Sequence, residues 1–418
     1  GGSWSYLARF ARSAFRSRVV PGDRDVNLGF RCLSSVAEPS ELAEVPVAEQ
    51  GPQPTRVGEA GKKFAARPVK VSLHEVTTIQ TGGTVSRLAI STDLEELHVT
   101  RLTRPAWATM FGRDAFGVYG DFQLPADATS AGVRQRLRWI PPGRFRMGSP
   151  PDESGRYENE LLHEVTISAG FWIFDTPCTQ ELWQAIMGMG DNPSRFPDPQ
   201  RPVEMVDWKQ AHEFADKLTS QIPSLSFSLP TEAQWEYACR AGTTTAIYSG
   251  PLEILGNANA PALDDIAWYG GNSGHEFDHE QPEDISGYDW LSEKQYDFST
   301  AGTRRVKQKH PNPWGLYDML GNVWEWCRDC WRDSYDDGPQ VDPQGPAASD
   351  GSLRVFRGGG WSSVARVARS AVRNGSAPGI RSDYLGFRCM SSVSQVAEQV
   401  SASKDEPRDE AVEKRRTQ

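Results

Sequence analysis

The sequence has no long apolar stretch, few cysteines and no excess of basic residues. No segment approaches the roughly 20 consecutive apolar residues needed to cross a bilayer. Its six cysteines are scattered over 418 residues, which is too sparse for a disulfide scaffold and favours a reducing compartment such as the cytoplasm. The formal net charge of -10 opposes general binding to a phosphate backbone. We therefore expect neither a membrane nor a nucleic acid as partner.

Motifs for metal or catalytic chemistry are also scarce. Cys327 and Cys330 form the one close pair, in the order Cys-Arg-Asp-Cys. Because no second pair and no nearby His accompanies them, incidental thiols explain the spacing better than a metal or redox site. No nucleophile motif supports a Ser-His-Asp hydrolase.

The chain does contain an internal duplication. Residues 1–36 read GGSWSYLARFARSAFRSRVVPGDRDVNLGFRCLSSV, and residues 358–393 read GGGWSSVARVARSAVRNGSAPGIRSDYLGFRCMSSV, without a gap between them. The second copy shares with the first Trp361, Arg366, Arg369, Ser370, Ala371, Arg373, Pro378, Gly386, Phe387 and Arg388. These residue types build a framework: an aromatic anchor, charged forks, and glycine for unusual dihedrals.

The positions that differ between the copies are interleaved with the matched ones. The interleaved ones in the second copy are Ser363, Val364, Val367, Val372, Asn374, Gly375, Ser376, Ala377, Ile380, Ser382, Asp383 and Tyr384, while Gly360 and Met390 differ outside this stretch. Size, charge and polarity all change there, which a packed core would not tolerate. The alternation predicts an exposed ligand-binding surface on a rigid frame, whereas ordinary drift at solvent-facing positions is the alternative explanation.

Composition divides the chain into five parts. We interpret residues 1–36 as the C-terminal fragment of a preceding repeat of the same domain, and residues 37–66, rich in Glu, Pro, Ala and Gly, as a disordered linker. Residues 67–134 show β-like alternation and are expected to form a small β-rich accessory region. Residues 135–393 form the main domain, and residues 394–418 are expected to be a disordered charged tail.

The main domain is dense in Trp, Gly, Pro and Asn and has few helical stretches. The clearest helices are Thr179 to Met187, Trp208 to Gln221 and Thr231 to Ala241. In the second of these, Ala211, Phe214, Ala215 and Leu218 are apolar at helical spacing. The pattern predicts an α+β domain with low regular secondary structure.

This domain resembles the formylglycine-generating enzyme family, also called the sulfatase-modifying factor family. The motifs that carry the resemblance follow in family order: residues 140–149 (IPPGRFRMGS), 163–167 (HEVTI), 202–208 (PVEMVDW), 229–238 (LPTEAQWEYA), 312–326 (NPWGLYDMLGNVWEW), and Arg357 to Trp361 through Gly386 to Arg388. The resemblance implies a variant of the C-type lectin fold, while fold alone does not settle function.

The enzymes of the family are expected to oxidise protein cysteines with copper held by two cysteines. In this chain those two positions correspond to Ser363 and approximately Ala368. A hydroxyl or methyl group cannot replace a thiolate as a soft ligand for Cu(I). We therefore expect no copper and no catalytic residues, with a related oxidase of protein cysteine kept as the alternative.

A second branch of the resemblance is the variable proteins of diversity-generating retroelements, which use this fold as a binding scaffold. The resemblance implies that adenines in codons ending in C or T are randomised, and such codons cannot encode Lys, Glu, Gln, Met or Trp. None of these five types occurs at the twelve differing positions between residues 363 and 384 or at their counterparts in the first copy, while Met390, which also differs, lies outside this stretch. The prediction is a non-catalytic protein that binds a protein or small-molecule ligand through its diversified surface, with a sensor or signalling module as a further alternative.

The resemblance also implies a structural calcium ion at the Gly-Asn-Val-Trp-Glu-Trp turn. Its ligands would be the side chains of Asp318 and Glu325 and the backbone carbonyls of Met319, Gly321 and Val323, all oxygen donors as a hard cation requires. A hydrogen-bonded turn without metal is the alternative.

Two charged groups remain. The arginines at Arg357, Arg366, Arg369, Arg373, Arg381 and Arg388 could form a basic face, but because most recur in both copies we expect them to tie loops together. The acidic residues Asp152, Glu153, Glu158 and Glu160 are expected to form a solvated loop.

Overall fold

The computed structural model describes residues 88–99, 104–125, 132–188, 190–222, 224–277, 279–349, 351–392 and 399–403. The first copy of the duplication and the predicted linker at 37–66 lie outside these residues. No helix in the described part of the chain is both long enough and apolar enough to cross a membrane.

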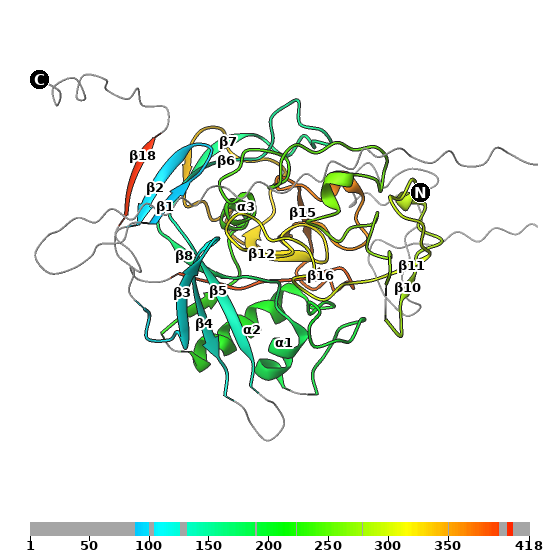
Figure 1. Ribbon diagram of the computed structural model, residues 1–418, viewed down its shortest axis with the longest axis horizontal. Coiled ribbons are helices and arrows are strands. Elements are labelled where there is room, and N and C mark those ends of the chain that lie inside the picture. Colours follow the sequence, from blue (N-terminus) through cyan, green and yellow to red (C-terminus); the bar gives the residue numbers. More distant parts are fainter. Residues whose placement is uncertain are drawn as a thin grey trace, which may run out of the picture. The chain divides into compact units, whose positions relative to one another are not determined.

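The largest sheet has six strands in the order β3-β4-β5-β8-β17-β9 (Figure 1). Their bounds are β3 Met110–Asp114, β4 Gly117–Gln123, β5 Arg134–Ile140, β8 Phe171–Phe174, β17 Met390–Ser392 and β9 Ser226–Ser228. Strand β17 pairs antiparallel with both β8 and β9. The end of the second copy is therefore an internal strand of the sheet, between β8 and β9.

A second sheet carries most of the duplicated motif. It has four strands in the order β15-β14-β12-β16, with bounds β12 Trp324–Cys330, β14 Arg354–Arg357, β15 Arg373–Ser376 and β16 Leu385–Gly386. Strand β15 is antiparallel to β14, whereas β16 runs parallel to β12 at the opposite edge. The chain between β15 and β16 must therefore cross from one edge of this sheet to the other.

The remaining strands form three small sheets. They are β13-β7-β6, β1-β2-β18 and β10-β11, with bounds β6 Gly143–Met147, β7 His163–Ile167, β13 Gln340–Val341, β1 Leu88–Ser91, β2 Glu95–Val99, β18 Gln399–Ser403, β10 Glu283–Asp284 and β11 Thr300–Ala301. Strands β10 and β11 lie at the end opposite β1 and β2 (Figure 1).

The three helices begin where their capping residues predict. Helix α1 spans Gln180–Met187 after the N-cap Thr179, and α2 spans Trp208–Gln221 after the N-cap Asp207. Helix α3 spans Glu232–Arg240, with a capping box between Thr231 and Gln234. A side-chain acceptor at the N-cap satisfies a free N–H of the first turn, which fixes the start of each helix.

Aromatic side chains fix the helices against the end of the motif. Trp183 on α1 stacks on Phe214 of α2, with ring centroids 5.6 Å apart. Phe387 contacts both rings edge-on, at 6.0 Å from Trp183 and 5.2 Å from Phe214. The apolar face predicted for α2 is confirmed, because Ala211, Phe214, Ala215 and Leu218 are its buried residues.

Two predicted boundaries are wrong. In the supposed accessory region, strand β3 pairs with β4 and β4 pairs with β5 of the six-stranded sheet, so the sheet continues across residue 134. Within the supposed disordered tail, residues 399–403 form β18 and pair with β2. Both errors have one cause, since composition reports local preference whereas these strands are defined by partners distant in sequence.

Candidate ligand-binding surface

Residues 363–384, which we call the variable block, contain all the positions predicted to bind a ligand. The block comprises a short 3-10 helix at Ala365–Val367, strand β15, and the connection from β15 to β16. Ile380 and Tyr384 are exposed by 45% and 38%. Ala377 is exposed as well, and every other predicted position except Val372 is partly exposed.

Many of the residues that match between the two copies are buried, in contrast to these positions. Trp361, Arg369, Ser370, Arg373, Phe387 and Arg388 are all buried. In most of the block, side chains shared by both copies are therefore buried and side chains that differ keep contact with solvent, while Arg381 is a shared residue that stays exposed.

Arg369 fixes the first half of the block. Its guanidinium pairs with Glu160, with Nη2 donating to Oε1 at 2.7 Å, and with Glu153, with Nη1 donating to Oε1 at 2.5 Å. Arg369 and Glu160 are fully buried. The prediction of a solvated acidic loop is wrong for Glu153 and Glu160, because both serve as counter-ions of Arg369.

Arg373 fixes strand β15. Its Nε and Nη2 donate to the two oxygens of Glu232 at 2.7 and 2.8 Å. Arg357 on β14 pairs with Glu236 one turn further along α3. Two arginines of the sheet are thus held by two carboxylates of one helix, an arrangement with the planar geometry that guanidinium favours.

Arg388 closes the frame at the other end. Its Nε and Nη2 donate to the two oxygens of Glu325 at 2.7 Å each, and its Nη1 donates to the carbonyl of Phe174 at 3.2 Å. The indole of Trp235 donates to the same carboxylate at 2.8 Å. The predicted structural role of the arginines is confirmed for this residue and for Arg357, Arg369 and Arg373.

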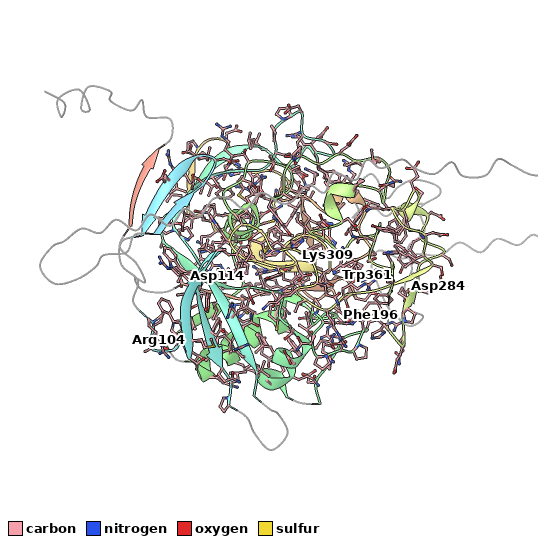
Figure 2. The ribbon with its side chains drawn as sticks, viewed as in Figure 1. Arg104, Asp114, Phe196, Asp284, Lys309 and Trp361 are labelled. Carbon is pink, nitrogen blue, oxygen red and sulfur yellow. The ribbon has the colours of Figure 1, made fainter. Side chains whose placement is uncertain are left out.

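Trp361 anchors the start of the block in a small apolar cluster. Its ring meets Phe196 edge-on at 5.7 Å, and its Nε1 donates to the carbonyl of Asp383 at 3.0 Å. Figure 2 shows Trp361 and Phe196 at the same end of the molecule as Asp284. Since Asp383 and Tyr384 lie next to this anchor, the two ends of the variable block meet here.

Two of the predicted binding positions do not fit a freely variable surface. Val372 is only 2% exposed and belongs to the main hydrophobic core. Gly375 faces Trp331, and a Cβ at this glycine would lie 2.7 Å from the indole ring. Exposed positions such as Ile380 and Tyr384 can change without loss of packing, whereas a larger residue at Val372 or Gly375 must displace neighbours. Val364 and Val367 lie between these cases, because each packs partly against a hydrophobic cluster.

The predicted calcium ligands do not fit a calcium ion. Both oxygens of Glu325 are taken by Arg388, which already supplies the positive charge. Asp318 accepts from the amide of Asn322 at 3.1 Å and from the backbone of Lys307 at 3.0 Å. With both side-chain ligands partnered, the carbonyls of Met319, Gly321 and Val323 make no complete set. Among the described residues no group of three or more His, Cys, Asp or Glu is placed to hold a metal.

The positions expected for copper lack the chemistry to bind it. Ser363 Oγ accepts a hydrogen bond from the backbone of Gly360 at 2.9 Å, and Ala368 is buried. The cysteines that the structure describes are buried free thiols at other positions. Burial raises the pKa of Cys239 to about 12, which disfavours the thiolate that would ligate a metal.

Next to the variable block lies a buried carboxyl group that sequence reasoning missed. Glu204 is fully buried, and its Oε1 accepts from the backbone of Phe196 at 2.9 Å while its Oε2 has no hydrogen-bond partner. Burial raises the pKa of Glu204 to about 8. Burial and the charge of Glu283 raise the pKa of Asp383 to about 6. No sequence motif marks this pair, because the two residues are distant in the chain.

Glu204 makes stability depend on pH. The folded carboxyl keeps its proton up to about pH 8, whereas the unfolded one loses it near its ordinary pKa of 4.5. The free energy of unfolding therefore falls as the pH rises between these values. We expect Glu204→Gln to melt at a higher temperature than the unmodified protein at about pH 8 and at the same temperature at about pH 4. Glu164→Gln, at an exposed position of β7, is the control, and equal melting curves for Glu204→Gln at both pH values would contradict the assignment.

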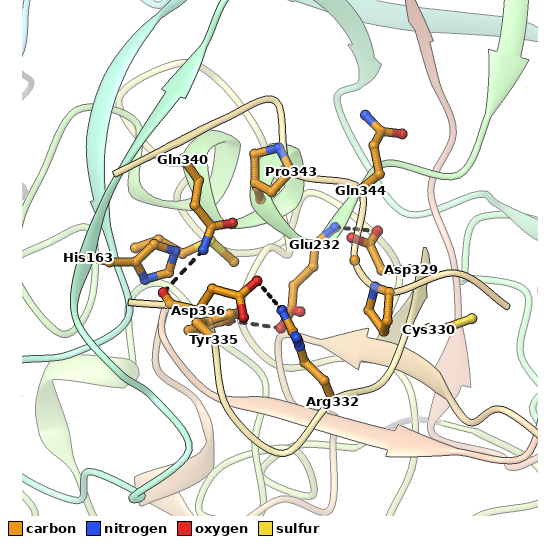
Figure 3. Close-up of a pocket in the computed structure, with 14 residues that line it drawn as sticks. His163, Glu232, Asp329, Cys330, Arg332, Tyr335, Asp336, Gln340, Pro343 and Gln344 are labelled. Atoms are coloured by element: carbon orange, nitrogen blue, oxygen red, sulfur yellow. Dashed lines mark hydrogen bonds and ion pairs between the residues drawn. The ribbon is translucent and has the colours of Figure 1, made fainter. Parts of the chain in front are cut away.

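A hollow of about 240 Å³ lies behind β15, away from the predicted binding positions. Asp329, Tyr335 and His163 line it together with Glu232 (Figure 3). Asp329 accepts from the backbone of Glu232 at 2.8 Å, and burial raises its pKa to about 7. Glu232 is also the partner of Arg373, so this hollow borders the frame and not the variable surface. Cys330 lines it as well, although the sequence marked Cys330 only by its spacing from Cys327.

Comparison with known proteins identifies the domain. A family profile described as the sulfatase-modifying factor enzyme 1-like domain matches residues 123–393. The chain is 34% identical over 195 residues to the formylglycine-generating enzyme of Streptomyces coelicolor, covering 46% of this chain and 52% of that protein. It is 32% identical over 195 residues to serine/threonine-protein kinase pkn1 of Chlamydia pneumoniae, covering 46% of this chain and 24% of the kinase. The chain thus spans about half the length of the first relative and about a quarter of the second.

A solved structure also matches. Treponema denticola variable protein 1 superimposes with a TM-score of 0.50 at 30% sequence identity, covering 65% of this chain and 99% of that one. The family match and this structure confirm the α+β fold of the C-type lectin type that the sequence motifs predict.

Proposed function

Since the chain belongs to the sulfatase-modifying factor enzyme 1-like family but carries no thiol at either copper position, we propose that it is a non-catalytic ligand-binding protein. The variable block is its recognition surface. The frame of buried arginines and aromatic residues holds that surface in one conformation, which lowers the entropy lost on binding.

One observation carries this proposal. Within one continuous segment, most residues shared by the two copies are buried, with Gly379 and Arg381 exposed, whereas the residues that differ are at least partly exposed, with Val372 as the exception. In a catalytic site, by contrast, the side chains shared by both copies would be exposed to the substrate, because the reacting groups must stay the same while the surface around them changes. The likeness to a protein named variable protein supports the same assignment.

The exposed side chains can supply both affinity and selectivity. Ile380 and Tyr384 are large apolar groups of the kind that anchor interfaces. Asn374, Ser382 and Asp383 add hydrogen-bonding groups beside them. The ligand in this proposal is a protein surface or a small molecule large enough to touch both ends of the block.

An exchange of ten positions tests the proposal. The variant takes the residues of the first copy at every predicted position except Val372 and Gly375. We expect it to enrich different sequences from a random peptide library displayed on phage, while its melting temperature stays within about 5 °C of the original. Enrichment of the same peptides by both proteins would refute a recognition role for the block.

The alternative function is an oxidase of protein cysteine. Its test is incubation of the protein with Cu(I) and a cysteine peptide, followed by mass spectrometry for the aldehyde product. We expect no conversion, because Ser363 and Ala368 offer no soft ligand. Conversion that rises with added copper would establish the enzyme and overturn the proposal.

A further inference from the structure

An aromatic pair outside the duplication borders the variable block. Tyr288 and Trp290 stack with ring centroids 4.4 Å apart, and Trp290 is 45% exposed. The indole Nε1 of Trp290 donates to the carbonyl of Ser362 at 3.3 Å. This contact joins the pair directly to the start of the variable block.

The local fold explains why this indole faces outward. Strands β10 and β11 pair antiparallel, and a 3-10 helix at Asp289–Leu291 lies in the connection between them. Ile285 and Leu291 on either side are buried in the same small cluster as Trp361. The segment is thus anchored at both ends while Trp290 stays on the surface, which is unusual for so large an apolar side chain.

Contacts connect this pair to the other end of the block as well. The hydroxyl of Tyr288 donates to Glu283 at 3.2 Å, and Arg195 pairs with the other oxygen of Glu283 at 3.4 Å. Arg195 lies over the ring of Phe196, which contacts Trp361. Trp361 binds the carbonyl of Asp383. A continuous network of contacts therefore connects the aromatic pair to both ends of the variable block.

The charge of this surface is strongly negative. Residues 276–297 contain eight acidic residues and a single basic one, Lys294. Asp289 and Glu293 are exposed beside Trp290, and Asp383 lies at the edge of the block. Such a surface attracts cations and repels anions.

We propose that Tyr288 and Trp290 form a fixed anchor that binds a basic segment of a partner protein, while the variable block selects among such partners. The inference rests on the proposed function and names the class of ligand. An arginine or lysine side chain stacks on the exposed indole and pairs with the neighbouring carboxylates, which combines a cation–π contact with charge complementarity. Because the anchor lies outside the duplication, it is the same whatever the block contains.

The test uses the full chain and a fluorescein-labelled oligoarginine peptide, with binding followed by fluorescence anisotropy. We expect Trp290→Ala to weaken binding about threefold to tenfold, and Trp290→Tyr to retain most of it. The loss should be the same in the original protein and in the ten-position variant. Val341→Ala, at an exposed position of β13, is the matched control and should bind normally.

Two outcomes would overturn the inference. Equal binding by Trp290→Ala and the original protein, with unchanged melting curves, would show only general attraction by the acidic surface. Stronger binding of an oligoglutamate peptide would show that the charge argument is wrong. The result is separable from the proposed function, because the library selection depends on the block and the oligoarginine measurement depends on Trp290.

Discussion

Replacement of Arg388 by Met is expected to lower the free energy of unfolding by about 3–5 kcal/mol. The change leaves the carboxylate of Glu325 buried without its cation, at a position only 1% exposed. It also removes the donor to the carbonyl of Phe174. An unpaired buried charge costs more than the pair itself contributes, so the loss exceeds that of an ordinary surface substitution. Urea denaturation followed by tryptophan fluorescence measures it.

Arg381→Met is the matched control for this experiment. Arg381 also pairs with a carboxylate, that of Asp207 at 3.0 Å, but its side chain is 49% exposed. Solvent screens such a pair, and we expect a loss of about 0–1 kcal/mol. If both variants lost equally little, the buried arginines would not be the frame that holds the variable block.

Exchange of the complete variable block is expected to destabilise the protein, unlike the ten-position exchange. The complete exchange places Phe at Val372 and Arg at Gly375. Phe at the buried position 372 overpacks the core, which costs about 1–3 kcal/mol. Any side chain at position 375 must also push the Trp331 ring away. Urea denaturation of the two exchanged proteins, side by side, measures the difference.

The ten-position variant is the control for this comparison, because it keeps Val372 and Gly375. Restoring Val372 alone in the completely exchanged protein should recover part of the lost stability. Equal stability of the complete and the ten-position exchange would mean that the core repacks freely around position 372. Burial would then not separate the positions that can vary from those that must be kept, and it would not support the proposed function.

Local sequence signals were sufficient to predict the three helices and to divide the duplicated motif into framework and variable positions. The caps at Thr179 and Thr231 and the apolar spacing of α2 depend on neighbours a few residues away, which the sequence shows directly. Comparison of the two copies gave information like that from a set of substitutions, because residues that are identical in both copies are expected to be structural. For the arginines this reasoning succeeded because paired guanidinium groups tolerate no substitution.

Long-range partners could not be predicted in the same way. Glu160 and Glu153 looked solvated because their cation, Arg369, lies far along the chain. Val372 looked variable because the copies differ there, although burial at that position depends on the whole core. Tyr288 and Trp290 lie outside the duplication, so comparison of the copies gave no information about them. An exposed Trp in an acidic segment was the one available signal.

The counter-ions of the frame all precede the arginines that neutralise them. Glu160, Glu232 and Glu325 are synthesised before Arg369, Arg373 and Arg388, and strand β17, which lies between β8 and β9, follows all of them. A chain that stops short of this last stretch has carboxylates with no cations and a gap between β8 and β9. We therefore expect premature termination or a frameshift within the variable block to leave the protein unfolded. Only a chain translated to the end of the motif would then display an intact surface.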